Sequence, residues 1–507
     1  MKRMMFITAA LMLFLTSCER PTGQPEQTPP AALSGKVYFA LDKQSLPLNV
    51  FMVTVRLSRA GHASIEKSIY ANKDSAASVL IPSVAVGVWA IDVKARGSDS
   101  TLLYSGEAEV SVLENTVSQV NVMMTPVSIG VGSVQINIIW GELQPAIFPK
   151  TYGGAGDEAA MSIHPTKDKG FIFGGITHSL GQAGDAWVVK TTAAGTVTWS
   201  KNYGTSGEDR VNSILQTSDG GYLFAGYQYG LGEDSWIVKL DSSGTIQWSK
   251  NYGLNGDDAF LMIKELSDGS FLTCGYTYSS NWGAGNFYDG RVVKITPTGS
   301  IIWSKIFGGT GGDFTMNFIE IPQKGFYVSG YNGSVPGDIY DLWLMELDQS
   351  GELVWEKIYK TPYEERSAAG ITKTSDGHLM LSGYRNTSQG RKGLIIKTDT
   401  AGNELWTKEY PSVNGDILKA HQLSDNSVLL SGYSTVTNYG LQGMLLKVTS
   451  DGTMIWTKYF GGTGSDMFSE FKIVDPLSVA IIGHTTSSGA GGQDLWLLKV
   501  TNNGVIQ

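Results

Sequence analysis

The chain repeats one pattern about every 50 residues, from residue 147 to its last residue. The clearest copy, residues 234–253, reads Asp-Ser-Trp-Ile-Val-Lys-Leu-Asp-Ser-Ser-Gly-Thr-Ile-Gln-Trp-Ser-Lys-Asn-Tyr-Gly. Periods of this length are typical of solenoids, propellers and repeat arrays. The second tryptophan of the pattern recurs at intervals of 49 to 55 residues, as Trp199, Trp248, Trp303, Trp355, Trp406 and Trp456.

The residue types within each copy predict strands and tight turns. Short runs rich in Val, Ile, Tyr, Phe and Trp are separated by clusters of Gly, Asn, Asp and Ser, which is the pattern of β-hairpins. In the second copy the expected strands cover 210–217, 222–227, 235–240 and 245–252. Four strands per repeat is the composition of a propeller blade.

The last copy stops one strand short, and the missing strand has a counterpart at the start of the array. Residues 494–507 end where the next tryptophan would stand, while residues 147–154 read Ile-Phe-Pro-Lys-Thr-Tyr-Gly-Gly. We therefore predict an all-β, seven-bladed β-propeller over 144–507, closed by a strand at 147–152 that leaves no open sheet edge. The alternative is a linear β-solenoid, whose coils are usually shorter and need capping repeats. The count of seven comes from the aromatic hinge that ends each copy: Tyr152-Gly153, Tyr203-Gly204, Tyr252-Gly253, Phe307-Gly308, Phe460-Gly461 and the degenerate Tyr359-Lys360 and Tyr410-Pro411.

These repeats resemble a known group. The succession Tyr-Gly-Gly-x-Gly-x-Asp, Asp-Gly-Gly-Tyr and Asp-x-Trp-x-x-Lys-x-Asp-x-x-Gly-x-x-x-Trp is similar to the β-propeller repeat of bacterial secreted and surface proteins. Its Gly-x-x-x-Trp element resembles, more distantly, the tryptophan-docking repeats of quinoprotein-like propellers, which include dehydrogenases and the outer-membrane assembly scaffold. Nothing in the chain matches the cofactor ligands of those dehydrogenases, and we expect no cofactor.

The N-terminal residues predict a targeting signal. Two basic residues and an apolar run over 4–15 form a signal peptide at 1–17, and Leu-Thr-Ser-Cys at 15–18 resembles a bacterial lipobox. That resemblance implies cleavage before Cys18, lipidation of its thiol and a membrane contact through lipid chains. The alternative is an ordinary signal peptide with an incidental cysteine. The residue after Cys18 is Glu19 and not the Asp that is associated with inner-membrane retention in some bacteria. The resemblance therefore favours an outer-membrane lipoprotein, and it leaves open whether the protein faces the periplasm or the outside.

Two segments separate this anchor from the ring. Residues 18–32 are rich in proline and predict an extended tether. Residues 33–141 lack the repeat and alternate polar and apolar residues in about seven short runs, which predicts an immunoglobulin-like β-sandwich acting as a stalk. A separate binding role for this domain is the alternative. Cys274, the only other cysteine, is predicted to be a small buried hydrophobic residue in the ring.

Acidic residues gather in the loops that a propeller places on one face. With a formal net charge of −9, this argues against nucleic acid as a partner. The recurring carboxylates could bind Ca²⁺, although an aspartate that recurs once per blade more often caps a turn. The candidates for Ca²⁺ are Asp157, Asp209, Asp257, Asp313 and Asp466.

The longest and least repetitive loop, in blade three, is the predicted ligand site. Aromatic rings beside amides and carboxylates could stack on sugars and bond to their hydroxyls. Alternatively, Trp282 and Phe287 pack the loop against its neighbour blade. The predicted site comprises Tyr278, Trp282, Asn286, Phe287, Tyr288 and Asp289, with Tyr340 from blade four and Tyr439 from blade six.

Signals for catalysis are weak. No nucleophile elbow, zinc-protease helix or phosphate loop occurs, and we assign no catalytic residue. The leading hypothesis is a monomeric, non-catalytic recognition module that binds a glycan or an envelope protein on its loop face. The alternatives are an outer-membrane assembly scaffold and a polysaccharide-acting enzyme that uses two carboxylates.

Overall fold

The computed structural model describes residues 34–40, 50–70, 78–112, 119–126, 134–140, 148–179, 183–230, 232–254, 256–278, 287–333, 340–360, 365–388 and 390–507. The chain divides into two compact units, 1–144 and 145–507. The predicted signal peptide, Cys18 and the tether lie outside the described residues. Among the residues described, no helix is long and apolar enough to cross a membrane.

The N-terminal unit contains eight strands joined edge to edge in the order β3-β2-β5-β6-β7-β8-β1-β4, and every pairing is antiparallel. Val53 and Val55 on β2 are buried, as are Ile91 and Val93 on the neighbouring β5, so one face of this pair is apolar. The strands are β1 (Ser34–Ala40), β2 (Met52–Ser58), β3 (Ile65–Tyr70), β4 (Ser78–Ala85), β5 (Gly87–Arg96), β6 (Leu102–Val112), β7 (Gln119–Pro126) and β8 (Val134–Trp140).

The sequence predicted about seven strands in this unit and did not predict β3. Its sequence, Ile-Glu-Lys-Ser-Ile-Tyr, carries two charges and no run of alternating apolar residues. It lies at the edge of the sheet and pairs only with β2. Edge strands are often short and charged, because charge discourages pairing with other chains.

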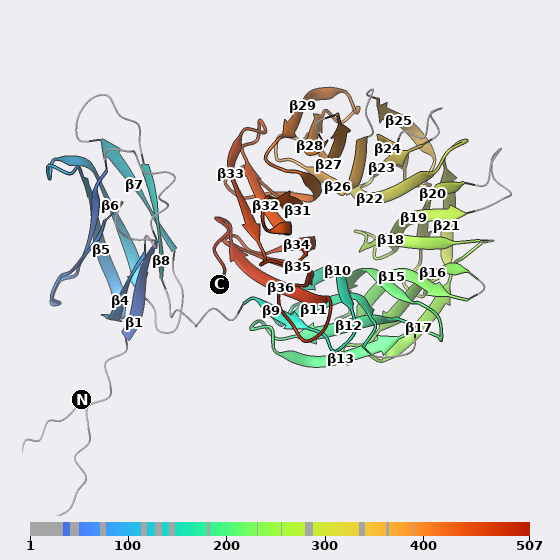
Figure 1. Ribbon diagram of the computed structural model, residues 1–507, viewed down its shortest axis with the longest axis horizontal. Coiled ribbons are helices and arrows are strands. Elements are labelled where there is room, and N and C mark those ends of the chain that lie inside the picture. The colour runs from blue at the N-terminus through green and yellow to red at the C-terminus, as the bar shows by residue number, and fades with distance from the viewer. Residues whose placement is uncertain are drawn as a thin grey trace, which may run out of the picture. The chain divides into compact units, whose positions relative to one another are not determined.

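The C-terminal unit contains seven four-stranded antiparallel sheets, which Figure 1 shows arranged as a ring. This confirms the predicted all-β fold with four-stranded repeats and the propeller arrangement. Blade one is β10 (Glu158–Pro165), β11 (Phe171–Thr177), β12 (Asp185–Thr191) and β13 (Val197–Tyr203); blade two is β14 (Arg210–Gln216), β15 (Tyr222–Tyr229), β16 (Glu233–Leu240) and β17 (Ile246–Asn251); blade three is β18 (Asp258–Glu265), β19 (Phe271–Tyr278), β20 (Tyr288–Ile295) and β21 (Ile301–Phe307). Blade four is β22 (Asp313–Ile321), β23 (Gly325–Asn332), β24 (Asp341–Asp348) and β25 (Leu353–Tyr359); blade five is β26 (Glu365–Lys373), β27 (Leu379–Thr387), β28 (Gly390–Thr398) and β29 (Glu404–Tyr410). Blade six is β30 (Gly415–Gln422), β31 (Val428–Val436), β32 (Gly440–Val448) and β33 (Met454–Phe460); blade seven is β34 (Asp466–Asp475), β35 (Ser478–Thr485), β36 (Asp494–Thr501) and β9 (Lys150–Tyr152).

The seventh sheet joins the two ends of the repeat array. The C-terminal strand β36 pairs with β9, with Trp496 opposite Thr151. Phe148, just before β9, is buried in a cluster that includes Ile163 of blade one and Leu497 of blade seven. The first and last blades therefore share one core, which differs from the open-ended stacking of a linear solenoid.

In blades one to six a tryptophan of the outer strand packs against a turn glycine of the next blade, and five of the seven outer strands add a tyrosine. Trp199 of blade one lies against Gly244, in the turn between the third and fourth strands of blade two, where a Cβ would approach the indole to 3.0 Å. Gly244 has φ +78°, which other residues adopt with strain. In blades two to six the motif Gly-x-x-x-Trp thus contacts both neighbouring blades, and Phe148 takes the place of the tryptophan at Gly195 of blade one. The tyrosine at the end of the outer strand donates a hydrogen bond from its hydroxyl to the backbone carbonyl of the turn glycine in the next blade. These bonds are Tyr152 to Gly195 (2.6 Å), Tyr203 to Gly244 (2.7 Å), Tyr252 to Gly299 (2.8 Å), Tyr359 to Gly402 (2.9 Å) and Tyr410 to Gly452 (2.8 Å).

Replacing one of these buried hydroxyls should weaken the ring measurably. Tyr252→Phe removes the donor to Gly299 and leaves that carbonyl without it, so we expect the free energy of unfolding to fall by about 1 kcal/mol. Urea denaturation measures this change. Tyr229→Phe, at an exposed tyrosine of blade two, is the control, and an equal loss in both variants would contradict the interpretation.

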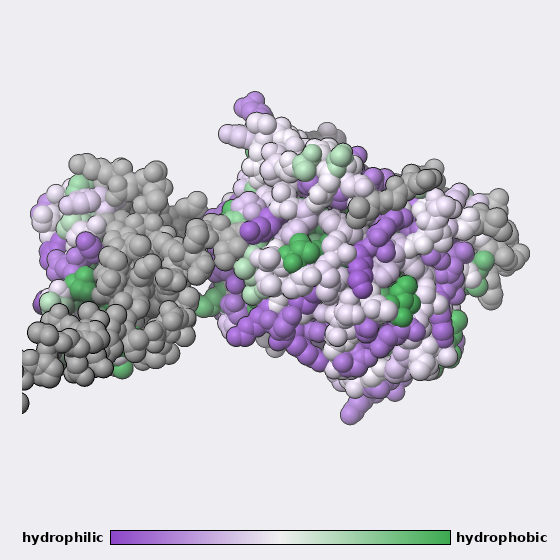
Figure 2. Space-filling model, turned by 90° about the horizontal axis from the view of Figure 1, so that it is seen from below, coloured by the Kyte–Doolittle hydropathy of each residue, from purple (hydrophilic) through white to green (hydrophobic). Residues whose placement is uncertain are grey.

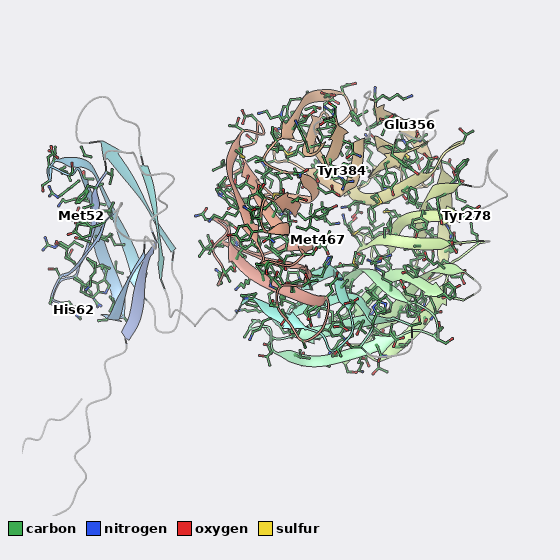
Figure 3. The ribbon with its side chains drawn as sticks, in the orientation of Figure 1. Met52, His62, Tyr278, Glu356, Tyr384 and Met467 are labelled. Carbon is green, nitrogen blue, oxygen red and sulfur yellow. The ribbon has the colours of Figure 1, made fainter. Side chains whose placement is uncertain are left out.

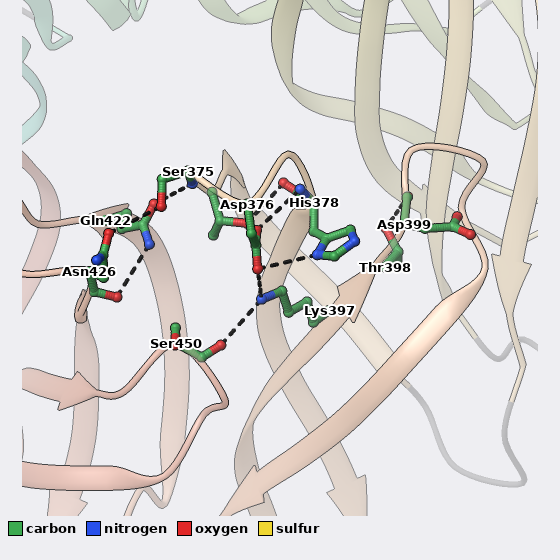
Figure 4. Close-up of polar contacts among 10 residues, drawn as sticks. Ser375, Asp376, His378, Lys397, Thr398, Asp399, Gln422, Asn426 and Ser450 are labelled. Atoms are coloured by element: carbon green, nitrogen blue, oxygen red, sulfur yellow. Dashed lines mark hydrogen bonds and ion pairs between the residues drawn. The ribbon is translucent and has the colours of Figure 1, made fainter.

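The lysine of the repeat pairs with the aspartate of the first turn in its own blade. Figure 4 shows this pair in blade five, where Lys397 Nζ lies 2.6 Å from Asp376 Oδ2. The lysine side chains are nearly buried while the aspartates are about half exposed. Two motif elements some 20 residues apart thus form one ion pair. The other pairs are Lys190–Asp168 (2.7 Å), Lys239–Asp219 (2.9 Å), Lys294–Asp268 (2.8 Å) and Lys447–Asp425 (3.0 Å).

Candidate functional site: aromatic and acidic residues on the loop face

Two classes of loop meet at one end of the blades. In a four-stranded antiparallel blade, the loop from the second to the third strand and the loop from the fourth strand into the next blade lie at the same end. In the view of Figure 3, Met467 of blade seven lies near the centre of the ring, whereas Tyr278 of blade three lies toward its margin. The loop face therefore extends from the axis to the margin, and the predicted ligand site occupies its blade three and blade four sector.

Six aromatic rings form a continuous array on this sector. Each ring contacts the next, and the contacts cross from blade three into blade four. We call this set the aromatic array. Its ring centroids are separated by 5.2 Å between Tyr278 and Tyr288, 5.2 Å between Tyr288 and Tyr276, 5.1 Å between Tyr276 and Phe314, 4.7 Å between Phe314 and Tyr331, and 5.4 Å between Tyr331 and Tyr340.

The structure joins three residues of the predicted site through three that the prediction left out. Tyr278, Tyr288 and Tyr340 belong to the array, and Tyr276, Phe314 and Tyr331 connect them. All six side chains are half-buried, so each keeps a surface toward solvent. A sequence signal for the missed residues exists, because a tyrosine follows the glycine of the second strand in five successive blades. These tyrosines are Tyr227, Tyr276, Tyr331, Tyr384 and Tyr433.

Carboxylates border the array on the side of blade two. The Tyr276 hydroxyl donates to Glu233 Oε2 at 3.2 Å, and the Asp257 carboxylate accepts the backbone N–H of Glu233 at 3.2 Å. Partial burial raises the pKa of Glu233, opposed by the hydrogen bond from Tyr276, and the charge of Asp257 raises it further. The array therefore has hydrogen-bonding groups beside its apolar ring faces.

Of the remaining residues of the predicted site, those that the structure describes do not join the array. Trp282 and Asn286 lie outside the described residues. Phe287 is 47 % exposed and Tyr439 is 55 % exposed, and neither contacts another described aromatic ring. Tyr439 belongs to the turn between β31 and β32 in blade six. Asp289 is buried, which does not fit the predicted role as a ligand contact.

The carboxylates considered for Ca²⁺ hold loop backbone in place. Asp313 accepts the N–H of Gly309 at 2.8 Å, and Asp466 accepts that of Gly462 at 2.9 Å. Asp209 accepts the N–H of Thr205 in the same geometry. Asp157 instead reaches the neighbouring blade, where it accepts the N–H of Gln493 at 2.8 Å, and Asp257 does the same with Glu233. Within the described ranges, no group of three or more His, Cys, Asp or Glu side chains is placed to hold a metal ion.

Buried carboxylates face each other in pairs at two of the blade junctions. A Cβ on Gly308 would lie 2.2 Å from an oxygen of Asp289 and 2.7 Å from an oxygen of Asp313, so the two carboxylates face each other across this glycine. Burial, and then the charge of Asp313, raises the pKa of Asp289 to about 6. Glu158 and Asp494 face each other in the same way across Gly153. The recurrence of such a pair at a second junction indicates a structural role.

Removing one charge from the pair should stabilise the ring near neutral pH. Asp289 has a folded-state pKa above its usual value of 3.8, so the wild-type ring loses stability as the pH rises from about 4 through 6. Asp289→Asn avoids this loss, and we expect a gain of about 1 kcal/mol at pH 7 after allowing for solvent screening. Thermal unfolding at pH 4 and pH 7 tests the sign, because a gain of equal size at both values would exclude titration of Asp289 as its cause.

In a second aromatic cluster, in blades five and six, the polar groups bind to one another. The Arg391 guanidinium lies 3.7 Å from the ring centroid of Tyr384 and donates to Asp416 at 2.8 Å. The Tyr433 hydroxyl donates to the other oxygen of Asp416 at 2.5 Å. Since these groups satisfy one another, the half-buried aromatic array of blades three and four is the better candidate for a ligand.

Comparisons with known proteins give structural likenesses only. No protein-family model matches the chain, and no curated protein matches its sequence. Among solved structures, a protein of unknown function from Dyadobacter fermentans DSM 18053 is 12 % identical, with 69 % of this chain and 97 % of that chain covered, at a TM-score of 0.41. The Pan2 WD40 domain of Neurospora crassa is 10 % identical, with 68 % and 89 % covered, at 0.40. Puromycin hydrolase is 10 % identical, with 69 % and 53 % covered, at 0.47. At these values the likenesses carry no argument about the function of this chain.

Proposed function

We propose that this protein is an envelope-anchored lipoprotein whose seven-bladed propeller is a non-catalytic recognition module that binds a saccharide on its loop face. The observation that supports the proposal most is the aromatic array, six half-buried rings in unbroken contact across two blades. Under this proposal the immunoglobulin-like N-terminal unit serves as a stalk between lipid and ring.

The chemistry of the array suits a sugar. Aromatic rings offer flat apolar surfaces with polar edges, which match the alternating C–H faces and hydroxyl edges of a pyranose. The Tyr278, Tyr288 and Tyr340 hydroxyls can donate and accept hydrogen bonds. Glu233, at the border of the array, can accept from sugar hydroxyls. A recognition site of this kind combines apolar walls with a few placed polar groups.

The carboxylate pairs support a non-catalytic function. Glycoside cleavage requires two carboxylates flanking the substrate bond. Asp289 and Asp313 are close to each other, but both are buried, and Asp313 accepts backbone N–H groups from Gly309 and Gly333. These oxygens are occupied by the protein itself.

Affinity capture from an envelope extract tests the proposal. Residues 33–507 serve as bait, beside a Tyr288→Ala variant that interrupts the array and a Tyr229→Ala control at an exposed tyrosine outside it. We expect wild type and control to retain a polysaccharide that the Tyr288→Ala variant loses. Retention of the polysaccharide by all three proteins would remove the array from the proposal.

A scaffold in outer-membrane assembly is the second candidate. It is favoured by apolar residues that remain exposed on the outer strands, among them Ile302 and Val354 at 51 % and 56 %. Figure 2 shows that, on the side of the ring seen there, apolar residues are separated by hydrophilic ones. On that side they are spaced apart and do not form one broad strip. Capture of a defined outer-membrane protein, unaffected by Tyr288→Ala, would make this function primary.

The lipid anchor is tested separately. Cells fed an alkyne-bearing fatty acid should label the wild-type chain and leave a Cys18→Ser variant unlabelled. Equal labelling of both chains would contradict the proposed lipidation of Cys18. Failure of this test would leave saccharide recognition by the ring unaffected.

A further inference from the structure

Three lysines lie on the innermost strands of three different blades: Lys264 on β18, Lys419 on β30 and Lys472 on β34. Lys264 pairs with Leu272 and Lys472 with Ala480, each three residues before the glycine of the second strand. Lys419 pairs with the residue one before that glycine. Since residues two apart in a strand project on the same side, the three side chains occupy two adjacent levels of the ring.

Solvent reaches this inner surface. Residues such as Leu261, Leu418 and Ser469 are half-exposed although their strands are the innermost of their blades. The three lysines are likewise half-buried. Because neighbouring blades cover both faces of an inner strand, this exposure lies toward the axis. The three lysines are therefore enclosed by the ring, with part of each residue exposed on its inner surface.

The positive charges exceed the negative charge that faces them. Glu470 is buried, and its carboxylate accepts from Lys472 Nζ at 2.8 Å, from the Ser162 hydroxyl at 2.7 Å and from the Ile163 N–H at 3.0 Å. This carboxylate is fully engaged by one ammonium and the two groups of blade one. Lys264 and Lys419 form no ion pair with any residue that the structure describes.

In the described part of the chain, Lys264 and Lys419 have only neutral hydrogen-bond acceptors or none, and the charge of Glu470 acts on both from a greater distance. Lys264 Nζ donates to the Asn317 amide oxygen at 3.2 Å and to the Phe318 carbonyl. Lys419 donates no hydrogen bond to any residue that the structure describes. The other titratable groups near these lysines, among the described side chains, are His164, His421 and Cys274. Burial and the charge of Lys472 lower the pKa of both histidines, and burial raises that of the Cys274 thiol to about 12, so none supplies negative charge near neutral pH.

We propose that Lys264, Lys419 and Lys472 form a binding site for an oxyanion, the phosphate, sulfate or carboxylate group of a small ligand, on the axis of the ring. Enclosing three like charges with a single counter-charge, that of Glu470, is unfavourable, and an anion among them reduces that penalty. Burial, and next the charge of Lys472, lowers the pKa of Lys264 to about 7, so the site is most cationic below neutral pH. This site lies on the inner strands and is distinct from the aromatic array.

Calorimetric titration with inorganic sulfate at constant ionic strength tests the site, because sulfate keeps its charge over the range used. We expect saturable binding at pH 6 with a dissociation constant below about 1 mM, weakening severalfold by pH 8.5 as Lys264 loses its proton. Lys419→Met should weaken binding at least about tenfold, whereas Lys250→Met, on the outer strand β17, should not. Absence of binding by wild type at pH 6, or unchanged binding by Lys419→Met, would overturn the proposal.

Thermal unfolding without sulfate separates ligand binding from a structural role. If Lys419 serves an anion site, Lys419→Met relieves repulsion and raises the melting temperature, and sulfate then stabilises wild type more than the variant. If Lys419 only balances Glu470, the same substitution lowers the melting temperature. A lowered melting temperature with no sulfate effect on wild type would contradict the anion site.

Discussion

A ring that begins at Gly153 should be less stable than one that begins at Pro145 by about 5 kcal/mol or more. The shorter chain lacks β9, and with it the ladder to Leu495, Trp496 and Leu497. It also lacks Phe148, which is buried in the core shared by blades one and seven. Loss of a buried phenylalanine side chain alone costs about 3 to 5 kcal/mol. The Tyr152 hydroxyl bond to Gly195, which joins blade seven to blade one, disappears as well.

Urea denaturation of the two chains, followed by tryptophan fluorescence, measures this difference. The chain that begins at Pro145 is the matched control, because it lacks the N-terminal unit and keeps the whole of β9. Equal stability of the two chains would mean that β9 does not close the ring in solution.

Asp219→Ala should destabilise the ring by about 2 to 4 kcal/mol, because it leaves the buried Lys239 ammonium without its counter-charge. The expected loss is at the lower end for broken buried pairs, since the Asp219 side chain is itself half-exposed. Burial opposes ionisation of Asp219, but hydrogen bonds from Thr217 and Lys239 outweigh it and lower its pKa to about 2. A folded-state pKa below the unfolded one gives stability that is present above about pH 4 and lost as the pH falls toward 2.

The pH dependence distinguishes the ion pair from simple loss of a turn residue. The destabilisation by Asp219→Ala should shrink between pH 4 and pH 2, where wild type loses the same interaction. Asp241→Ala, at an exposed turn aspartate that accepts hydrogen bonds from Ser243 and Thr245, is the control and should destabilise the ring less than Asp219→Ala does. A larger loss in the Asp241 variant would contradict the importance of the buried lysine.

The sequence predicts the repeat architecture well because each copy carries the same strand and turn signals. It also shows that Gly and Trp recur at a fixed spacing. It does not show that Trp199 packs on Gly244 of the following blade, since one period can describe contacts within or between copies. The pairing of Lys239 with Asp219 was missed for the same reason.

The candidate site was predicted in part. Loop length and composition pointed to Tyr278 and Tyr288, but Phe314 comes from the inner strand of the next blade and carries no loop signal. Asp289 has the sequence context of a loop residue, yet it is buried against Asp313. Lys264, Lys419 and Lys472, the lysines of the proposed oxyanion site, belong to separate copies and share no motif. Only the closed ring places them at adjacent levels along its inner surface.

A saccharide-array screen of the soluble chain tests the central claim most directly. Wild type and Tyr229→Ala should bind the same set of saccharides, and Tyr288→Ala should lose at least about tenfold in affinity for them, which corresponds to about 1.4 kcal/mol. Binding of no saccharide by wild type, or undiminished binding by Tyr288→Ala, would contradict recognition through the aromatic array.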